Sequence, residues 1–178
     1  MSIPDFPGAN PQGTELAQRL FVIHDQMRRD MAEFQRLVAA VVDDVRDPKG
    51  PGGDRVGPAL DAFRKRDWQR ILPRYCSQFC SFVHGHHTVE DASMFPTLRR
   101  RNPALGPAID RLVAEHKELM ARLDEVEERV GSLHRDPSAG PALLKAVNEA
   151  AELLEAHLRF EEESLPPTLV RLTYADIL

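Results

Sequence analysis

The feature that most constrains the fold of this chain is the placement of its prolines and glycines. They cluster in three segments, RDPKGPGGDRVGP (46–58), RRRNPALGP (99–107) and HRDPSAGP (134–141). Proline and glycine interrupt helices and favour turns. In the four stretches before, between and after these segments, apolar residues recur at every third or fourth position, which is the period of an α-helix. The sequence therefore predicts four helices joined by three breaks.

The predicted helices span approximately 14–45, 60–95, 108–130 and 142–164. Thr14 suits the N-cap of the first helix, and Pro73 marks a point where the second helix could restart. Leu, Ala, Glu and Arg dominate the composition and favour helix, while aromatic residues make up only 6% of the chain, which gives strands little support. Helices joined by turns favour an all-α, up-down-up-down antiparallel four-helix bundle. We expect a loose N-terminal arm over 1–13 and one bundle domain over 14–178.

Composition and charge argue against several classes of function. The net charge is -5 and no cluster of Lys and Arg alternates with aromatic residues, so nucleic-acid binding is not expected. The apolar stretches are shorter than the roughly 18–20 residues that cross a bilayer, and the N-terminus lacks the features of a signal peptide. Cys76 and Cys80 lie one helical turn apart and close no loop, which suits a reducing compartment. We therefore expect a cytoplasmic protein with no membrane or nucleic-acid partner, as a monomer or homodimer.

An internal repeat carries the chemistry of the chain. HHTVEDASMFPTL, which starts at His86, and HLRFEEESLPPTL, which starts at His157, share six of thirteen positions. Each copy contains a His-x-x-x-Glu pair, ending at Glu90 in the first and Glu161 in the second, just before a proline. The i, i+4 spacing puts both side chains of a pair on one helix face. Because each pair continues an apolar stripe, these ionisable groups are predicted to be buried and to need partners or a cation.

His24 and His116 lie on the apolar stripes of the first and third predicted helices. Either one alone is more typical of a hydrogen-bonded core histidine. Both, however, lie about ten residues after the start of a helix, whereas the repeated pairs lie near the ends of the second and fourth helices. In an up-down-up-down bundle these positions meet, and at about 1.5 Å rise per residue they fall in one layer. The geometry predicts one metal site with six ligands: His24, His86, Glu90, His116, His157 and Glu161.

This order of residues resembles the hemerythrin-like (HHE cation-binding) family over nearly the whole chain. The resemblance implies two non-heme iron ions with an oxo or hydroxo ligand between them, and both glutamates bridging the ions. It also implies that the histidines of the first two helices serve one ion and those of the last two helices serve the other. A mixed set of imidazoles and carboxylates suits Fe, Mn or Zn better than Ca or Mg, which prefer oxygen ligands.

One position departs from the oxygen-carrying members of that family. They have a second histidine one turn after the third-helix ligand, where this chain has Met120. A thioether is a poor ligand for a hard ferric ion, so the ion at His116 and His157 is expected to be more open or to take a substitute ligand. His87 could add a ligand at the other ion, although it points about 100° away from His86 around the helix.

Open coordination favours reaction over reversible carriage. The first functional hypothesis is a di-iron protein that binds or reacts with a small oxidant such as dioxygen, peroxide or nitric oxide. The activity would then be of peroxidase, catalase-like or nitric-oxide-handling type. The second is a non-enzymatic protein that senses oxygen or iron, and the third is iron storage or delivery. The sequence leaves open whether the site turns over a substrate or only binds one.

Other polar residues near the repeat are expected to support the metal ligands or to be part of the core. Three acidic residues are expected to support the ligands or to face solvent: Asp91, Glu115 and Glu162. Cys76 and Cys80 share a helix face with His84 and His87, where a soft metal could bind, but buried helical cysteines are the commoner arrangement. Tyr75 is expected in the core, with a redox or hydrogen-bonding role as the alternative.

Overall fold

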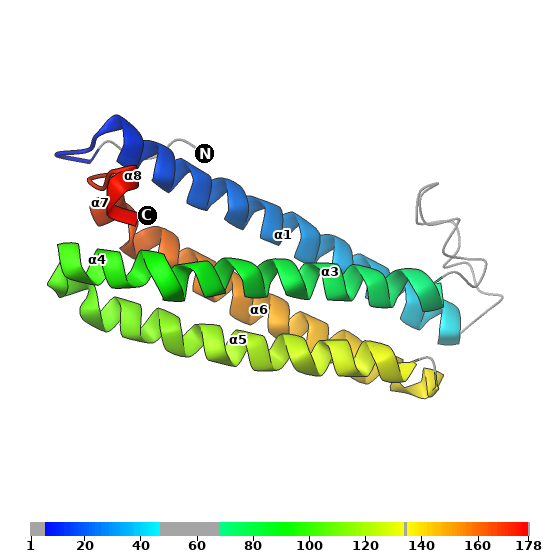
Figure 1. Ribbon diagram of the computed structural model, residues 1–178. Coiled ribbons are helices and arrows are strands. Elements are labelled where there is room, and N and C mark those ends of the chain that lie inside the picture. The colour runs from blue at the N-terminus through cyan, green and yellow to red at the C-terminus, as the bar shows by residue number, and fades with distance from the viewer. Residues whose placement is uncertain (1–5, 47–67, 134, 178) are drawn as a thin grey trace. The chain divides into compact units, whose positions relative to one another are not determined.

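The computed structural model describes residues 6–46, 68–133 and 135–177, and these residues form helices and connecting turns with no β-strand (Figure 1). The four long helices are α1 (Pro11–Arg46), α3 (Trp68–Val89), α5 (Gly106–Leu133) and α6 (Gly140–Ser164). The shorter elements are the π-helix η3 (Glu90–Met94), α4 (Phe95–Arg101), the 3₁₀-helices η4 (Pro103–Leu105) and η5 (Pro137–Ala139), α7 (Pro166–Leu169) and α8 (Tyr174–Ile177). The predicted all-α class is confirmed.

The predicted helices correspond to the four long helices, with differences at their ends. α1 begins at Pro11 instead of Thr14, because Asn10 acts as the N-cap: its Oδ1 accepts a hydrogen bond from the Gly13 N–H at 2.9 Å. Pro73 lies inside α3 and does not end it. The predicted start of the second helix near residue 60 lies outside the described residues, as does nearly all of the 46–58 break.

The chain divides into two compact units, and each long helix contributes a segment to both. The first unit comprises residues 1–28, 83–119 and 153–178, as far as the structure describes them. The second comprises residues 29–82 and 120–152, with the same restriction. All six predicted metal ligands belong to the first unit.

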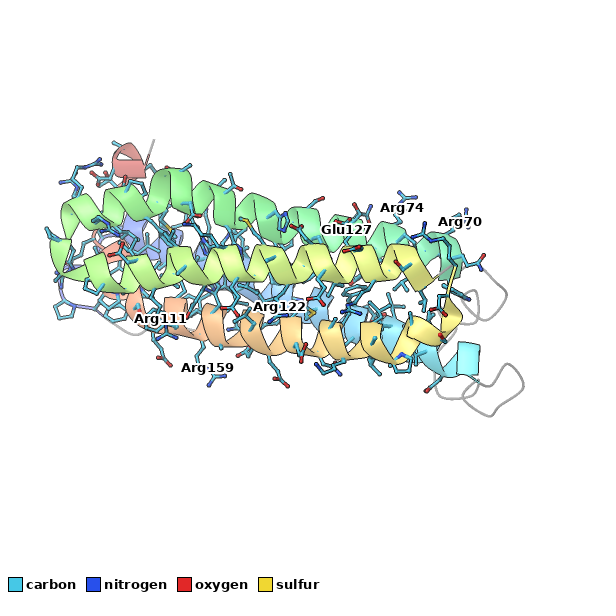
Figure 2. The ribbon with its side chains drawn as sticks, turned by 90° about the horizontal axis from the view of Figure 1, so that it is seen from below. Arg70, Arg74, Arg111, Arg122, Glu127 and Arg159 are labelled. Atoms are coloured by element: carbon cyan, nitrogen blue, oxygen red, sulfur yellow. The ribbon has the colours of Figure 1, made fainter. Side chains whose placement is uncertain are left out.

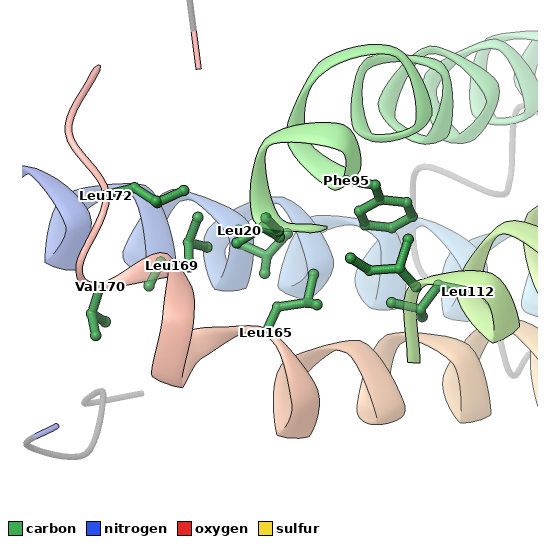
Figure 3. Close-up of a cluster of buried hydrophobic side chains, with 10 residues drawn as sticks. Leu20, Phe95, Leu112, Leu165, Leu169, Val170 and Leu172 are labelled. Atoms are coloured by element: carbon green, nitrogen blue, oxygen red, sulfur yellow. The ribbon is translucent and has the colours of Figure 1, made fainter. Parts of the chain in front are cut away.

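A hydrophobic core fills one part of the first unit (Figure 3). Phe95 and Leu98 of α4 pack there with Leu112 of α5 and with Leu165, which follows α6. The Phe95 ring also stacks on the imidazole of His116, with 5.4 Å between ring centroids. The core therefore adjoins the predicted metal site directly. The buried residues of this core are Ala17, Leu20, Phe95, Leu98, Ile109, Leu112, Leu165, Leu169, Val170 and Leu172.

The residues around the start of α1 contact the C-terminal segment within the same unit. The Asn10 N–H donates to the Val170 carbonyl at 2.9 Å, and the Asn10 Nδ2 donates to the Leu172 carbonyl at 3.1 Å. Gly13 permits this close approach, because a Cβ at that position would lie 2.2 Å from the Val170 carbonyl oxygen. These contacts position the start of α1, which carries His24.

Aromatic rings pack together in the second unit. The Phe34 ring lies 5.9 Å from the Tyr75 ring and 6.1 Å from the Phe79 ring. The Tyr75 hydroxyl donates to the Asp30 carbonyl at 3.1 Å. Burial, with the nearby negative charge of Asp30, raises the pKa of Tyr75 to about 12, so the phenol stays protonated. Tyr75 is thus a partly buried core residue with a hydrogen-bonding role.

Charged side chains cover the outer surface of the helices. Within the first unit, Arg111 of α5 and Arg159 of α6 project outward (Figure 2). The Arg111 guanidinium lies over the Phe160 ring at 3.6 Å from the centroid, which shields part of that ring from water. Among the helices that the structure describes, none has the combined length and apolar character needed to cross a membrane.

Candidate metal centre

The structure brings all six predicted ligands together in the first unit. They come from five helical elements: His24 from α1, His86 from α3, Glu90 from η3, His116 from α5, and His157 and Glu161 from α6. Five of the six are buried, and the side chain of His86 is 8% exposed. Buried ionisable groups are costly unless they are paired or bind a metal. The cluster is therefore unusual for a helical core and needs a chemical explanation.

Four of these residues form a first group of metal-ligating atoms, namely His24, His86, Glu90 and Glu161. The His86 Nε2 lies 2.8 Å from Glu90 Oε1, and the His24 Nε2 lies 3.4 Å from Glu161 Oε2. The Nε2 atoms of His24 and His86 face each other at 3.3 Å. Because two nitrogen lone pairs repel, a proton or a cation must lie between them.

His116 and His157 form a second group together with His87. The glutamates reach this group as well: Glu90 Oε2 lies 3.5 Å from the His116 Nε2, and Glu161 Oε2 lies 3.6 Å from the His157 Nε2. Both carboxylates therefore face histidines of both groups. The structure thus contains two adjoining groups of side chains, each of which could hold a metal ion.

His87 is the member of the cluster that the predicted ligand set omits. The repeat contains an indication that His87 is buried, because His87 aligns with Leu158, which is a fully buried core residue. Position 87 is therefore an inward-facing position, and a histidine there is buried. His87 also lies three residues before Glu90, so it is as much a helical neighbour of that glutamate as His86 is.

Many of the polar atoms in the cluster have no hydrogen-bond partner within the part of the chain that the structure describes. They are both ring nitrogens of His87, the Nε2 atoms of His116 and His157, and all four carboxylate oxygens of Glu90 and Glu161. The contacts between the glutamates and His116 and His157 are long, at 3.5 and 3.6 Å. An unsatisfied buried polar group costs about 1–3 kcal/mol. Nitrogen and oxygen atoms that converge in this way fit the donor set of a transition-metal ion.

Acidic residues orient three of the histidines by accepting hydrogen bonds from their Nδ1 atoms, which face away from the cluster. In each case a ring Nδ1–H donates to a carboxylate: His24 to Glu162 at 2.9 Å, His116 to Asp91 at 2.9 Å and His157 to Glu115 at 3.0 Å. Such a bond fixes the tautomer and turns the Nε2 lone pair towards the cluster. Asp91 and Glu162 occupy the same position in the two copies of the repeat, directly after the glutamates. The expected supporting role of these acids agrees with the observed contacts.

Arg28 holds Glu162 in its ionised form. Its guanidinium donates to both Glu162 oxygens, at 2.8 and 3.0 Å, and to Glu155 at 2.8 Å. Burial acts to raise the pKa of Glu162, but the hydrogen bonds from His24 and Arg28 outweigh it and lower the pKa. The carboxylate behind His24 thus stays negative and keeps the His24 Nδ1 protonated.

The two glutamates of the repeat have opposite electrostatic environments. Burial, together with the negative charge of Glu161, raises the pKa of Glu90 well above its usual range. Burial also acts to raise the pKa of Glu161, but the contact with the His24 Nε2 at 3.4 Å and the nearby histidines outweigh it and lower the pKa. Burial lowers the pKa of His86 to about 4, so this imidazole is neutral at neutral pH. A cation that binds Glu90 therefore competes with the proton that burial favours there.

The backbone around Glu90 forms a π-helix, in which the Phe95 N–H donates to the Glu90 carbonyl in an i→i+5 bond. In the second copy of the repeat the Leu165 N–H donates to the Glu161 carbonyl at 3.0 Å, an ordinary i→i+4 bond. The residue that aligns with Phe95 is Pro166, which has no N–H to make the longer bond. Short π-helical segments widen a helix locally and occur often at functional sites. The copies thus share ligand spacing but differ in backbone conformation.

The two cysteines belong to the core of the second unit. Cys76 and Cys80 are buried and free, with 3.9 Å between their Sγ atoms. The hydrogen bond with Cys80 and burial raise the pKa of the Cys76 thiol, so it stays protonated. Neither cysteine belongs to a potential metal-binding group among the described residues. The geometry therefore favours two buried helical cysteines over a soft-metal site.

Histidines and glutamates from five helical elements, gathered in one buried cluster, define an all-helical protein with a candidate metal site. The chain belongs to the hemerythrin HHE cation-binding domain family, whose model matches residues 53–169. The matched range contains both copies of the repeat and His116, while His24 precedes it. The resemblance drawn from the sequence is confirmed. No curated protein and no solved structure matches the chain significantly.

Proposed function

We propose that this chain holds two non-heme iron ions in the His/Glu cluster, where it binds or reacts with a small oxidant at an open metal position. The oxidant would be dioxygen, peroxide or nitric oxide. In this proposal Glu90 and Glu161 bridge the ions, and an oxo or hydroxo ligand completes the bridge as the family resemblance implies. The histidine ligands are His24 and His86 at one ion and His116 and His157 at the other.

The position of the Glu90 carboxylate carries this proposal. Its Oε1 lies 2.8 Å from the His86 Nε2, while its Oε2 lies 3.5 Å from the His116 Nε2. Each oxygen thus faces a nitrogen of a different histidine group. A bridging carboxylate needs this arrangement, whereas a ligand of a single ion would not.

The donor set suits Fe, Mn or Zn, and the family resemblance favours iron among them. Iron in such a shell supplies the redox chemistry and the exchangeable position that small oxidants require. The protein contributes orientation and exclusion of water. Glu162, Asp91 and Glu115 fix three imidazoles, and the Phe95 ring covers His116 on its apolar side.

We also propose that the four long helices follow an up-down-up-down antiparallel path over one domain, residues 14–178. The contacts of the first unit support this path. His24, near the start of α1, contacts Glu162, near the end of α6. His116, near the start of α5, contacts Asp91, which follows α3.

Turnover by the purified, iron-loaded chain tests the functional proposal. We expect consumption of peroxide or nitric oxide, or binding of dioxygen, in proportion to the iron content, and loss of this reactivity in Glu90→Ala. The matched control is Glu118→Ala, because Glu118 is an exposed glutamate on α5. A reversible optical response to oxygen without turnover would favour a non-enzymatic sensor, and release of iron on reduction would favour storage. A di-iron form inert to all three oxidants would contradict the proposal.

A further inference from the structure

His87 is a buried histidine whose two ring nitrogens have no hydrogen-bond partner among the described residues. A neutral imidazole has one donor and one acceptor, and a core histidine ordinarily satisfies at least one of them. Leaving both unpaired destabilises the folded state, because each buried nitrogen has lost its contact with water without gaining a partner. The aligned residue in the second repeat, Leu158, fills its buried position without this cost. Packing alone therefore does not account for a histidine at position 87.

The ring of His87 lies against the other histidines of the second group. It stacks on the His116 ring, with 4.0 Å between centroids and 13° between planes, and its centroid lies 5.1 Å from that of His157. Its neighbour His86 faces His24 of α1 instead. Successive residues on a helix point about 100° apart, so two adjacent histidines of α3 can serve the two groups separately.

We propose that His87 is a third histidine ligand of the ion at His116 and His157, so that the open position belongs to the ion at His24 and His86. This inference rests on the proposed di-iron function. Three imidazoles, two bridging carboxylates and the oxo or hydroxo bridge fill an octahedral shell, whereas two imidazoles with the same bridges leave one position free. His87 thus takes the place of the histidine that is absent at Met120.

The exposure of the histidines agrees with this assignment. At the ion proposed to be open, His24 is fully buried but the His86 side chain is 8% exposed, whereas His87, His116 and His157 at the other ion are at most 1% exposed. Solvent therefore reaches the cluster on the side of His86. The small oxidant is therefore expected beside His86 and His24.

The test compares His87→Ala with His84→Ala, which removes a half-buried histidine of the same helix outside both groups. In the cobalt-substituted protein, we expect five hyperfine-shifted imidazole N–H signals in the wild type and in His84→Ala, and four in His87→Ala. Azide, a probe of open positions, should bind once to the wild type and twice to His87→Ala. Loss of a ligand should also weaken binding of one metal ion by at least about 10-fold.

The outcomes separate this inference from the proposed function. Unchanged N–H signals and a single azide in His87→Ala would overturn the role of His87 while leaving the two-metal proposal intact. Fewer than two metals in the wild type would instead overturn the proposed function. If His87→Ala does not fold, the wild-type spectrum and the His87→Gln variant decide the question, because four N–H signals in the wild type exclude His87 as a ligand.

Discussion

At the scale of single residues, the two glutamates of the repeat are equivalent in sequence but differ in charge. Glu90 faces the negative charge of Glu161 in a buried position, so its neutral form is favoured when no metal is bound. Glu161 is held in the ionised form by His24. The two carboxyl groups of the metal-free site are therefore biased in opposite directions, and metal binding at Glu90 competes with protonation.

The raised pKa of Glu90 predicts how the stability of the metal-free chain depends on pH. A carboxyl group whose folded-state pKa exceeds its ordinary value of 4.5 stabilises the fold below that value, and the contribution is lost as the pH rises through the folded-state pKa. Glutamine does not titrate, so the Glu90→Gln variant does not undergo this pH-dependent loss of stability. Between pH 4.5 and the folded-state pKa, the variant should gain stability relative to the wild type by up to about 1.4 kcal/mol per pH unit, and above the folded-state pKa the gain should stay constant.

Urea unfolding of the metal-free proteins at pH 5 and pH 9 measures this difference. The control variant is Glu118→Gln, since Glu118 is exposed on α5. A stability difference between Glu90→Gln and the wild type that stays constant from pH 5 to pH 9 would contradict the assignment.

The acids behind the histidines should matter for metal affinity although they do not reach the metal themselves. Asp91→Asn and Glu162→Gln each weaken the bond that orients an imidazole, and we expect iron affinity to fall by about 10–100-fold. Competition with a chelator of known affinity measures the change. Glu163→Gln, an exposed neighbour of Glu162, provides the baseline, and equal affinities in all three variants would rule out the orienting role.

The sequence predicts most of the site because helical periodicity alone decides which residues share a face. His86 and Glu90, and likewise His157 and Glu161, are paired by their spacing, and the structure brings both pairs together with His24 and His116. The role of His87 cannot be predicted from helical periodicity alone. Its direction, about 100° from His86, becomes meaningful only when the positions of α5 and α6 around α3 are known.

At the scale of elements, prolines and glycines predict the number of long helices but not their ends. Thr14 has the properties of an N-cap, yet α1 begins earlier because Asn10 is fixed by its contacts with Val170 and Leu172. Those partners are more than a hundred residues away in the chain, so no local pattern reveals them. The π-helix at Glu90 is equally hidden, because it depends on which backbone N–H reaches one carbonyl.

The N-cap assignment gives a direct comparison of two variants. Asn10→Ala should lower the free energy of unfolding by about 1 kcal/mol, within a range of roughly 0.5–2, because it leaves the Gly13 N–H without its acceptor. Thr14→Ala should cost less, since Thr14 lies inside α1. Thermal unfolding of both variants measures the difference, and a larger loss in Thr14→Ala would place the cap at Thr14 after all.

At the scale of the whole molecule, metal binding and folding should be coupled. The cluster places buried polar atoms together without hydrogen-bond partners among the described residues, which costs stability when no cation is present. A ligand that binds only the folded state adds about 4 kcal/mol at a thousand times its Kd. We therefore expect the unfolding temperature to rise on addition of iron.

Calorimetry of the metal-free and iron-loaded chains measures this shift. The variant Glu161→Ala should lose most of the shift, whereas Glu163→Ala should keep it, because Glu163 is exposed and Glu161 is fully buried. An unfolding temperature that does not respond to iron in the wild type would show that the cluster does not bind the ion in the folded state.

The central claim is that the His/Glu cluster binds two metal ions, and the metal content of the chain tests it most directly. Protein produced with iron and freed of loosely bound metal should contain two irons per chain, and Glu90→Ala should contain fewer because its bridging oxygens are gone. One iron in the wild type, or none in a folded chain, would contradict the account. So would two irons retained in both Glu90→Ala and Glu161→Ala, since neither carboxylate would then bridge the ions.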